Sequence, residues 1–381
     1  MKNEITWSQE TIDQFQIQFL AWYHRYKRNL PWRVNQDPYR IWISEIMLQQ
    51  TRVDTVIDYY YRFMEKFPTI EQLAAAPEEE LLKMWEGLGY YSRARNIQSA
   101  AKQIMERHQG QFPNTVEEIS QLKGIGPYTT GAIASIAFGL PEPAIDGNIM
   151  RVVSRLFCIP EDIAKPSSRK VFDHYTRAIL SPEEPGEMNQ AFMDLGSAIC
   201  TPKNPECEAC PLQAFCQAYQ EGNMTDFPVK TKKAKPKDVY YFAAAIENEQ
   251  GEFWFEQRED QGLLAKMWHF PLEEVDQATF DQAYKQFQKE EIEQLSLIAE
   301  EEEQDPVLFD SLPVIWQTRH LGEVKHLFSH LRWHVLLFYG RTREAQAFEN
   351  GQWIDKKAYE AYAFPKIQHK MWDEIAKNQK H

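Results

Sequence analysis

The spacing of apolar residues changes once along the chain, and the change predicts two kinds of fold. In the N-terminal part, apolar residues recur every three or four positions over long segments, which is typical of helices packed on a core. One such segment begins in "PNTVEEISQL", where Thr115 and Glu118 have the spacing of a capping box. After Lys237 the apolar residues come in short aromatic and β-branched runs, such as "VYYFAAAIE" and "WHVLLFYG", which predict strands.

The chain is therefore predicted to be a multidomain protein. We expect an all-α region at residues 1–222, a linker at 223–237 with the basic run "KTKKAKPK", and an α+β domain at 238–381. Two acidic stretches, at 277–303 and 356–377, predict helices within the second domain.

A glycine-rich turn in "QLKGIGPYTTGAIAS" separates two helices of the first region. We expect the first helix to end at Leu122 or Lys123 and the second to begin at Pro127, because proline suits the first position of a helix. Gly124 and Gly126 leave backbone N–H groups unshielded at the positive end of the second helix. This arrangement predicts a phosphate-binding turn, with a plain connector between helices as the alternative.

Two carboxylates are isolated among apolar or neutral residues. Glu45, in "RIWISEIMLQQTRV", is the only acidic residue between Asp37 and Asp54. Burial at this position would raise the pKa of its carboxyl group and make it a candidate general acid. Asp146, in "PEPAIDGNIMRV", precedes an apolar helix and is predicted to be its N-cap, a catalytic carboxylate, or both.

Four of the five cysteines follow the spacing C-x6-C-x2-C-x5-C, at Cys200, Cys207, Cys210 and Cys216. Four thiolates so close together can hold a [4Fe–4S] cluster or a zinc ion. The single C-x2-C pair favours the cluster, because zinc modules usually contain two such pairs. The cysteine spacing alone leaves two alternatives open: a zinc ion, or four cysteines that bind no metal.

The net charge and the distribution of apolar residues limit how this chain could bind nucleic acid or a membrane. The chain carries a net charge of −14, so binding to nucleic acid would have to use local basic groups and backbone N–H groups. Arg93, in "YYSRARN", is one candidate for a phosphate contact. The polar N-terminus and the lack of a long apolar run predict a cytoplasmic protein without a membrane span.

Several motifs occur together and in one order: "LPWR", "SEIMLQQTRV", "GLGYYSRARN", "LKGIGPYTTGAIAS", "AIDGNIMRV", "MNQAFMDLG" and the cysteine set. In this combination the chain resembles the helix–hairpin–helix DNA glycosylases of the endonuclease III superfamily, and among them the MutY-type adenine DNA glycosylases. The resemblance covers about residues 7–220 and extends into the second domain.

The resemblance implies a role for each isolated carboxylate. Glu45 matches the acid that protonates the departing adenine. Asp146 matches the carboxylate that stabilises the oxocarbenium-like sugar, either electrostatically or by transient covalent capture. Asn148 matches a residue that supports Asp146 and the water. Tyr128 stands where bifunctional relatives have a lysine that attacks the sugar, so the chain is expected to release adenine without cleaving the strand.

Other positions are implied to contact the substrate. Those expected to line the adenine pocket are Arg28, Leu30, Trp32 and Gln190. Gln50 and Tyr90 match residues that wedge into the duplex. The whole expected DNA-binding set is Gln50, Thr51, Tyr90, Arg93, Gly124 and Gly126.

The second domain resembles a Nudix (MutT-like) domain around "DQGLLAKMWHFPLE", but it lacks the acidic box that binds Mg²⁺ for pyrophosphate hydrolysis. The second domain is therefore expected to recognise part of the substrate and not to hydrolyse a pyrophosphate. In "VKHLFSHLRWHV", Phe328, Ser329 and His330 match the loop that recognises 8-oxoguanine opposite the adenine.

These features together predict a monofunctional adenine DNA glycosylase with a [4Fe–4S] cluster. We expect it to act as a monomer on double-stranded DNA with adenine opposite 8-oxoguanine or guanine. Two alternatives stay open at this point: a bifunctional glycosylase and lyase, and a catalytically silent DNA-binding iron–sulfur protein.

Overall fold

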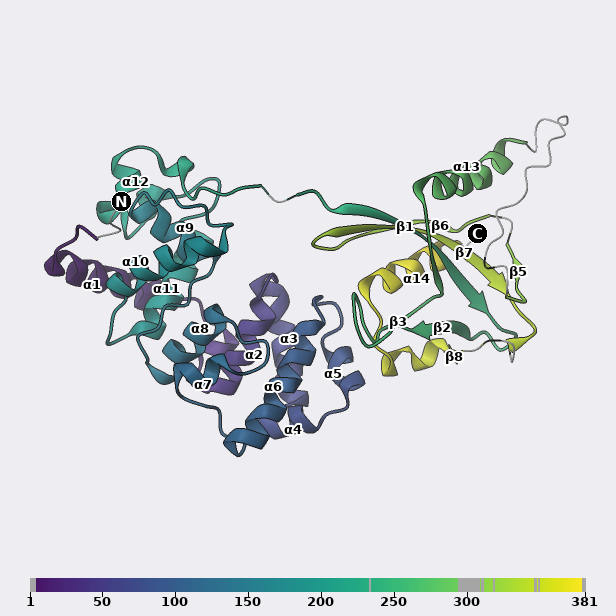
Figure 1. The fold of residues 1–381 in the computed structure, drawn as a ribbon, viewed down its shortest axis with the longest axis horizontal. Coiled ribbons are helices and arrows are strands. Elements are labelled where there is room, and N and C mark those ends of the chain that lie inside the picture. Colours follow the sequence, from purple (N-terminus) through teal and green to yellow (C-terminus); the bar gives the residue numbers. More distant parts are fainter. Residues whose placement is uncertain are drawn as a thin grey trace. The chain divides into compact units, whose positions relative to one another are not determined.

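The computed structural model (Figure 1) describes residues 5–232, 234–293, 309, 312–317, 319–345, 348 and 350–378. The chain folds into two compact units, each discontinuous in sequence. One unit consists of Met1–Ala76 and Ser92–Lys232, and the other of Pro77–Tyr91 and Lys233–His381. Within the described ranges, no helix is long and apolar enough to cross a membrane.

The first unit is helical, as the spacing of its apolar residues predicts. Its longer helices are α1 (Gln9–Tyr26), α2 (Pro38–Leu48), α3 (Val53–Lys66), α6 (Ser92–His108), α8 (Pro127–Phe138), α9 (Gly147–Leu156), α10 (Arg169–Ile179) and α11 (Pro185–Ala198). Its shorter ones are α4 (Ile70–Ala75), α7 (Val116–Ser120) and α12 (Gln217–Gln220), with 3₁₀ turns η1 (Pro31–Arg33), η2 (Pro166–Ser168), η3 (Cys207–Ala209), η4 (Gln213–Phe215) and η5 (Met224–Asp226).

One aromatic core holds several of these helices together. Phe19 from α1, Phe172 from α10 and Phe192 from α11 are fully buried in it. The rings of Phe19 and Phe192 meet edge to face, with 4.8 Å between their centroids, a favoured geometry for aromatic pairs. This packing fixes α9 and α11, which carry Asp146 and Gln190 at or near their N-terminal ends.

The turn between α7 and α8 follows the sequence signals closely. Pro127 is the first residue of α8, as predicted, and Gly126 is the N-cap of this helix. Gly124 has a φ of +78°, and a Cβ atom there would lie 2.5 Å from the Cβ atom of Asn96. Glycine is therefore required at this position by conformation and by space. The preceding helix, α7, ends at Ser120, two or three residues before the predicted end, because 121–125 already form the turn.

The second unit is a mixed β-sheet with a helix on each face. Its strands are β1 (Lys237–Glu247), β2 (Phe253–Gln257), β3 (Trp268–His269), β4 (Leu272–Val275), β5 (Ile315–Trp316), β6 (Gly322–Leu327), β7 (Leu331–Arg341) and β8 (Gly351–Ile354). The central strands β1 and β7 are parallel, and the other pairs are antiparallel.

The two faces of the sheet are covered by α13 (Gln277–Glu293) and α14 (Lys366–Asn378) (Figure 1). Successive side chains of a strand point to opposite faces, and β1 shows this directly. Phe242 packs with Phe280 of α13, whereas Ala243 belongs to the cluster that contains Ile367 of α14.

The two predicted helices of this unit are observed in modified form. The first is seen as α13, and its predicted continuation over 294–303 lies outside the described residues. The second is split into η7 (Lys356–Ala361) and α14, because Pro365 cannot continue a helix that precedes it.

The segment 77–91 packs with this second unit, although it lies within the predicted helical region. It contains α5 (Glu78–Met84) and the loop that carries Tyr90. Glu78 pairs with Lys266 at 2.8 Å, and Glu86 pairs with His369 of α14. The sequence pattern did not predict this association.

Candidate active site and cluster loop

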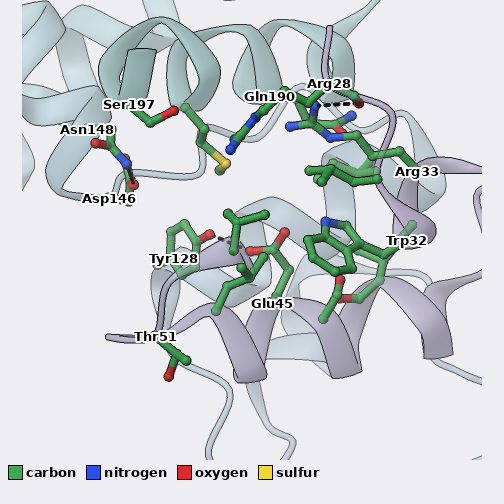
Figure 2. Close-up of a pocket in the computed structure, with 17 residues that line it drawn as sticks. Arg28, Trp32, Arg33, Glu45, Thr51, Tyr128, Asp146, Asn148, Gln190 and Ser197 are labelled. Atoms are coloured by element: carbon green, nitrogen blue, oxygen red, sulfur yellow. Dashed lines mark hydrogen bonds between the residues drawn. The ribbon is translucent and has the colours of Figure 1, made fainter. Parts of the chain in front are cut away.

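The expected catalytic and pocket residues meet in one cavity of about 190 Å³ in the helical unit (Figure 2). It is formed by α2, η1, α8, α11 and the start of α9. Its lining contains all eight positions expected to be catalytic or to hold adenine: Arg28, Leu30, Trp32, Glu45, Tyr128, Asp146, Asn148 and Gln190.

Glu45 lies on the buried side of α2 and only 5% of its surface is exposed. Burial raises the pKa of its carboxyl group to about 7, while the hydroxyl of Tyr128 and the cation of Arg33 act to lower it. The Tyr128 hydroxyl donates a hydrogen bond to Glu45 Oε2 (Figure 2). Glu45 therefore changes between neutral acid and carboxylate close to neutral pH.

Tyr128 is the second residue of α8, directly after Pro127, so the turn of the hairpin aims it into the cavity. Its pKa is raised well above the ordinary value by burial, with the carboxyl groups of Glu45 and Asp146 adding to the effect. The phenol stays protonated at neutral pH, so it is available as the hydrogen-bond donor to Glu45.

Asp146 is the N-cap of α9, as one interpretation of the sequence predicted. Its Oδ1 accepts the backbone N–H of Ile149 at 2.7 Å, and its Oδ2 accepts the side-chain amide of Asn148 at 2.8 Å. Burial raises the pKa of Asp146, and these hydrogen bonds oppose that rise. The carboxylate lines the cavity while it caps the helix, so the two roles are compatible.

The expected adenine-pocket residues surround the cavity on the side of η1 and α11. Trp32 and Leu30 are buried, and the Trp32 ring meets Tyr60 edge to face at 5.4 Å. The Gln190 side chain donates to the carbonyl oxygen of Gly186 at 3.3 Å, which leaves its own oxygen as a further hydrogen-bonding group.

Two charged residues at this cavity were missed by the sequence analysis. Asp194 of α11 accepts hydrogen bonds from Arg33 Nη1 at 2.7 Å and from Arg28 Nε at 2.9 Å. Arg33 lines the cavity beside Glu45. The sequence did hold a signal, since Asp194 is the only acidic residue between Glu187 and Glu206.

The two residues expected to wedge into a duplex share an unusual backbone conformation. Gln50 has a φ of 60° and Tyr90 a φ of 49°, the left-handed region that costs energy for any residue other than glycine. Both side chains are exposed, Tyr90 by 44%. Thr51, next to Gln50, lines the cavity. Gly124 and Gly126 are exposed at the start of α8, as a phosphate-binding turn requires.

The structure corrects the expectation for Arg93. Only 8% of its surface is exposed, and its Nη1 donates to the carbonyl oxygens of Ile46 at 2.7 Å and Gln49 at 2.6 Å. Its guanidinium group therefore binds the C-terminal end of α2, where the carbonyl groups of a helix lack partners within the helix. Arg93 supports the loop of Gln50 rather than presenting a cation to phosphate.

The expected 8-oxoguanine loop is the tip of the β6–β7 hairpin. Phe328, Ser329 and His330 occupy it, and Ser329 and His330 are exposed. The Phe328 ring packs against Trp333 at 5.0 Å. Ser329 Oγ lies 2.6 Å from the hydroxyl of Tyr90, so this hairpin contacts an expected wedge residue of the segment 77–91.

Cys200, Cys207, Cys210 and Cys216 all line a second cavity of the helical unit. Arg155 of α9 lines it too and donates from Nη1 to Cys200 Sγ at 3.1 Å. Among the described residues, no three His, Cys, Asp or Glu side chains are grouped to hold a single metal ion. A shared cavity with a donor to sulfur suits an iron–sulfur cluster, which binds one thiolate at each iron.

The cluster loop is also tied to the active site. Arg151 of α9 donates to the carbonyl oxygen of Cys200 and to Asn148 Oδ1, both at 2.7 Å. Asn148 in turn donates to Asp146. The cysteine loop is therefore connected to Asp146 through the side chains of Arg151 and Asn148.

Three family models match this chain. Residues 43–177 match the HhH-GPD superfamily of base excision DNA repair proteins, residues 242–374 a NUDIX domain, and residues 200–216 the iron–sulfur binding domain of endonuclease III. The cysteine loop therefore binds a [4Fe–4S] cluster.

Curated relatives and solved structures agree with these matches. The chain is 35% identical to the adenine DNA glycosylase of Mus musculus over 84% of this chain and 69% of that protein. It is 32% identical to the adenine DNA glycosylase of Homo sapiens over 92% of this chain and 72% of that protein. The structure of a thermostable thymine-DNA glycosylase aligns with a TM-score of 0.50 and 26% identity, over 55% of this chain and 97% of that one.

Proposed function

Because this chain belongs to the adenine DNA glycosylases, we propose that it removes adenine opposite 8-oxoguanine or guanine and leaves the DNA strand intact. One observation supports this best: a buried carboxyl group that takes up a proton near pH 7 lies beside a phenol, in the same cavity as a helix-capping carboxylate. Among the described residues that line the cavity there is no lysine, so none of them offers the amine that strand cleavage by a Schiff base needs.

Glu45 is the proposed general acid. In its neutral form, which dominates below a pH of about 7, it donates a proton to N7 of adenine and makes the base a neutral leaving group. Tyr128 then donates its hydrogen bond to the carboxylate that remains. The cavity, rather than the duplex, has to hold the adenine at this moment, so the nucleotide must first flip out of the helix.

Asp146 is the proposed stabiliser of the sugar. Loss of the protonated base leaves an oxocarbenium-like ring, and a fixed carboxylate favours this positive charge. The hydrogen bonds from Ile149 and Asn148 hold Asp146 in place and favour its ionised form. Asn148 also supports the attacking water.

When bound, the [4Fe–4S] cluster supplies a cross-link between four cysteines of the loop 200–216. Hydrolysis of the bond between base and sugar transfers no electrons. Arg151 and Arg155 anchor the loop to α9, and the loop's role is therefore to order this side of the active site.

The β6–β7 hairpin is the proposed reader of the base opposite adenine. Ser329 and His330 are exposed polar residues at its tip, and both can form hydrogen bonds to the edge of a lesion. Ser329 lies against Tyr90, the proposed wedge, so the wedge and the reader sit side by side within one unit.

A single-turnover assay on four duplexes tests the proposal. The protein should release adenine from A:8-oxoguanine fastest and from A:G more slowly, and should release no base from T:A and thymine-glycol duplexes. The abasic strand should stay whole until it is heated in alkali. Strand cleavage at the rate of base loss would support the bifunctional alternative, and no base release from any duplex would support a silent DNA-binding protein.

Combined substitution of Ser329→Ala and His330→Ala should reduce the preference for 8-oxoguanine over guanine by roughly tenfold or more, because each hydrogen bond contributes about 1 kcal/mol. The ratio of the single-turnover rates on A:8-oxoguanine and A:G measures this. Glu249→Ala with Gln250→Ala, in an exposed turn of the same sheet, is the matched control and should leave the ratio unchanged. An equal fall on both duplexes would show that the hairpin only supports the fold.

A further inference from the structure

We propose that Asp194 is a positioning residue that neutralises Arg33 and thereby keeps Glu45 available as a neutral acid. The inference rests on the proposed role of Glu45. Asp194 itself is not among the residues that line the active-site cavity, and only 4% of its surface is exposed. It lies behind the cavity, on the α11 side of the two arginines.

Both carboxylate oxygens of Asp194 accept hydrogen bonds from arginine side chains. Arg33 donates to both oxygens, from Nη1 at 2.7 Å and from Nη2 at 3.1 Å, which is the two-point geometry that an arginine and a carboxylate favour. Arg28 adds a bond from Nε at 2.9 Å. One buried anion thus binds two cations that line the cavity.

Arg33 is the link between Asp194 and Glu45. Both Arg33 and Glu45 line the cavity, and the Arg33 cation acts to lower the pKa of Glu45. Tyr23 lies beneath the Arg33 guanidinium at 5.7 Å from its ring centre, and Arg28 and Glu187 are further charged groups close to Tyr23. Those around Glu45 are Tyr128 and Asp146.

The negative charge of Asp194 explains why Glu45 can stay protonated in the same cavity as Arg33. An unopposed cation close to a buried carboxyl group favours its ionised form, and an ionised Glu45 has no proton to give. Asp194 supplies the opposing charge and binds both terminal nitrogens of the guanidinium group. Burial then dominates, and the pKa of Glu45 stays near 7.

The test is the pH dependence of single-turnover adenine release by Asp194→Asn in the full-length, cluster-containing protein. Asparagine keeps the shape but removes the charge that opposes Arg33. The alkaline limb of the profile should move to lower pH by about one unit or more, so the rate falls at pH 7.5 and recovers toward wild type in acid. A purely structural role would instead lower the rate equally at every pH.

Two further variants complete the test: one removes the Arg33 cation, and the other is a control at a different pair of aspartate and arginine. Arg33→Gln, alone or combined with Asp194→Asn, removes the cation and should move the alkaline limb to the wild-type pH or above. Asp173→Asn is the matched control, because Asp173 also accepts from an arginine, Arg177, at 2.8 Å but on the exposed side of α10. It should leave the profile unchanged.

The proposal fails if Asp194→Asn lowers the rate without moving the limb, or if Arg33→Gln shifts the limb to lower pH. Should Asp194→Asn not fold, Asp194→Glu, which keeps the charge, should keep the wild-type limb, and a limb that moves to lower pH in Asp194→Glu would overturn the proposal. Failure of this idea is separable from failure of the proposed function: the position of the alkaline limb tests Asp194, whereas adenine release by the wild-type protein tests the glycosylase activity and the rate of Glu45→Gln tests the proposed acid.

Discussion

A Glu45→Gln variant is expected to release adenine about 10²–10⁴-fold more slowly than the wild type while it still binds the mispaired duplex. Glutamine fills the same buried space and can accept the Tyr128 hydrogen bond through its amide oxygen, but it has no acidic proton. Single-turnover base release and a separate duplex-binding measurement distinguish loss of chemistry from loss of affinity.

The pH dependence of adenine release is a second test of Glu45 as the acid. The pKa of Glu45 is raised to about 7, so its neutral form is present below that pH and the wild-type rate should fall as the pH rises through 7. Glu45→Gln should lack this limb. Glu142→Gln, which alters a carboxylate bound to Arg177 in the same unit, is the control and should keep both the rate and the limb. A Glu45→Gln rate within a few-fold of wild type would remove Glu45 as the acid.

An Asp146→Asn variant is expected to lose about 10²–10³-fold in rate with little loss of stability. Asp146 caps α9 and also provides the negative charge proposed to stabilise the sugar, and asparagine can replace only the first role. Asparagine is as good an N-cap as aspartate, so α9 keeps its first turn. It carries no charge, so the positive sugar loses its stabilising partner. Thermal unfolding and single-turnover rate, measured on one preparation, separate the two.

The matched control for this prediction is Asp276→Asn. Asp276 precedes α13 and accepts the backbone N–H of Thr279 at 2.7 Å, but it lies in the other unit. It should change neither the rate nor the unfolding temperature appreciably. An Asp146→Asn variant that unfolds early and regains its rate on cooling would show that the cap alone matters.

Much of the fold was predictable because it depends on short stretches of sequence. The helices, the turn with Gly124 and Gly126, and the alternating strands all follow from local periodicity and from residues with special backbone preferences. Glu45 and Asp146 were identifiable for a related reason: each is an isolated carboxylate in an apolar or neutral stretch, and such isolation indicates burial.

What could not be predicted depends on contacts between distant residues. Asp194 lies 161 and 166 positions from the arginines that it binds, and no local pattern joins them. Arg93 is an instructive error. It lies four residues before Ile97, and eleven before Ile104, on the buried face of α6, so helical periodicity already placed it inside while its charge suggested the surface.

The packing of residues 77–91 with the C-terminal unit affects how this protein can be divided. A protein cut at the linker would lose not only the reader hairpin but also Lys266 and His369, the partners of Glu78 and Glu86. Tyr90, the proposed wedge, would lose its support together with the proposed reader, so a truncated protein cannot report on either alone. The same holds for chimeras: a C-terminal unit exchanged between relatives should be transferred with its own copy of residues 77–91, since a junction at the linker alone would combine the wedge of one protein with the support of another.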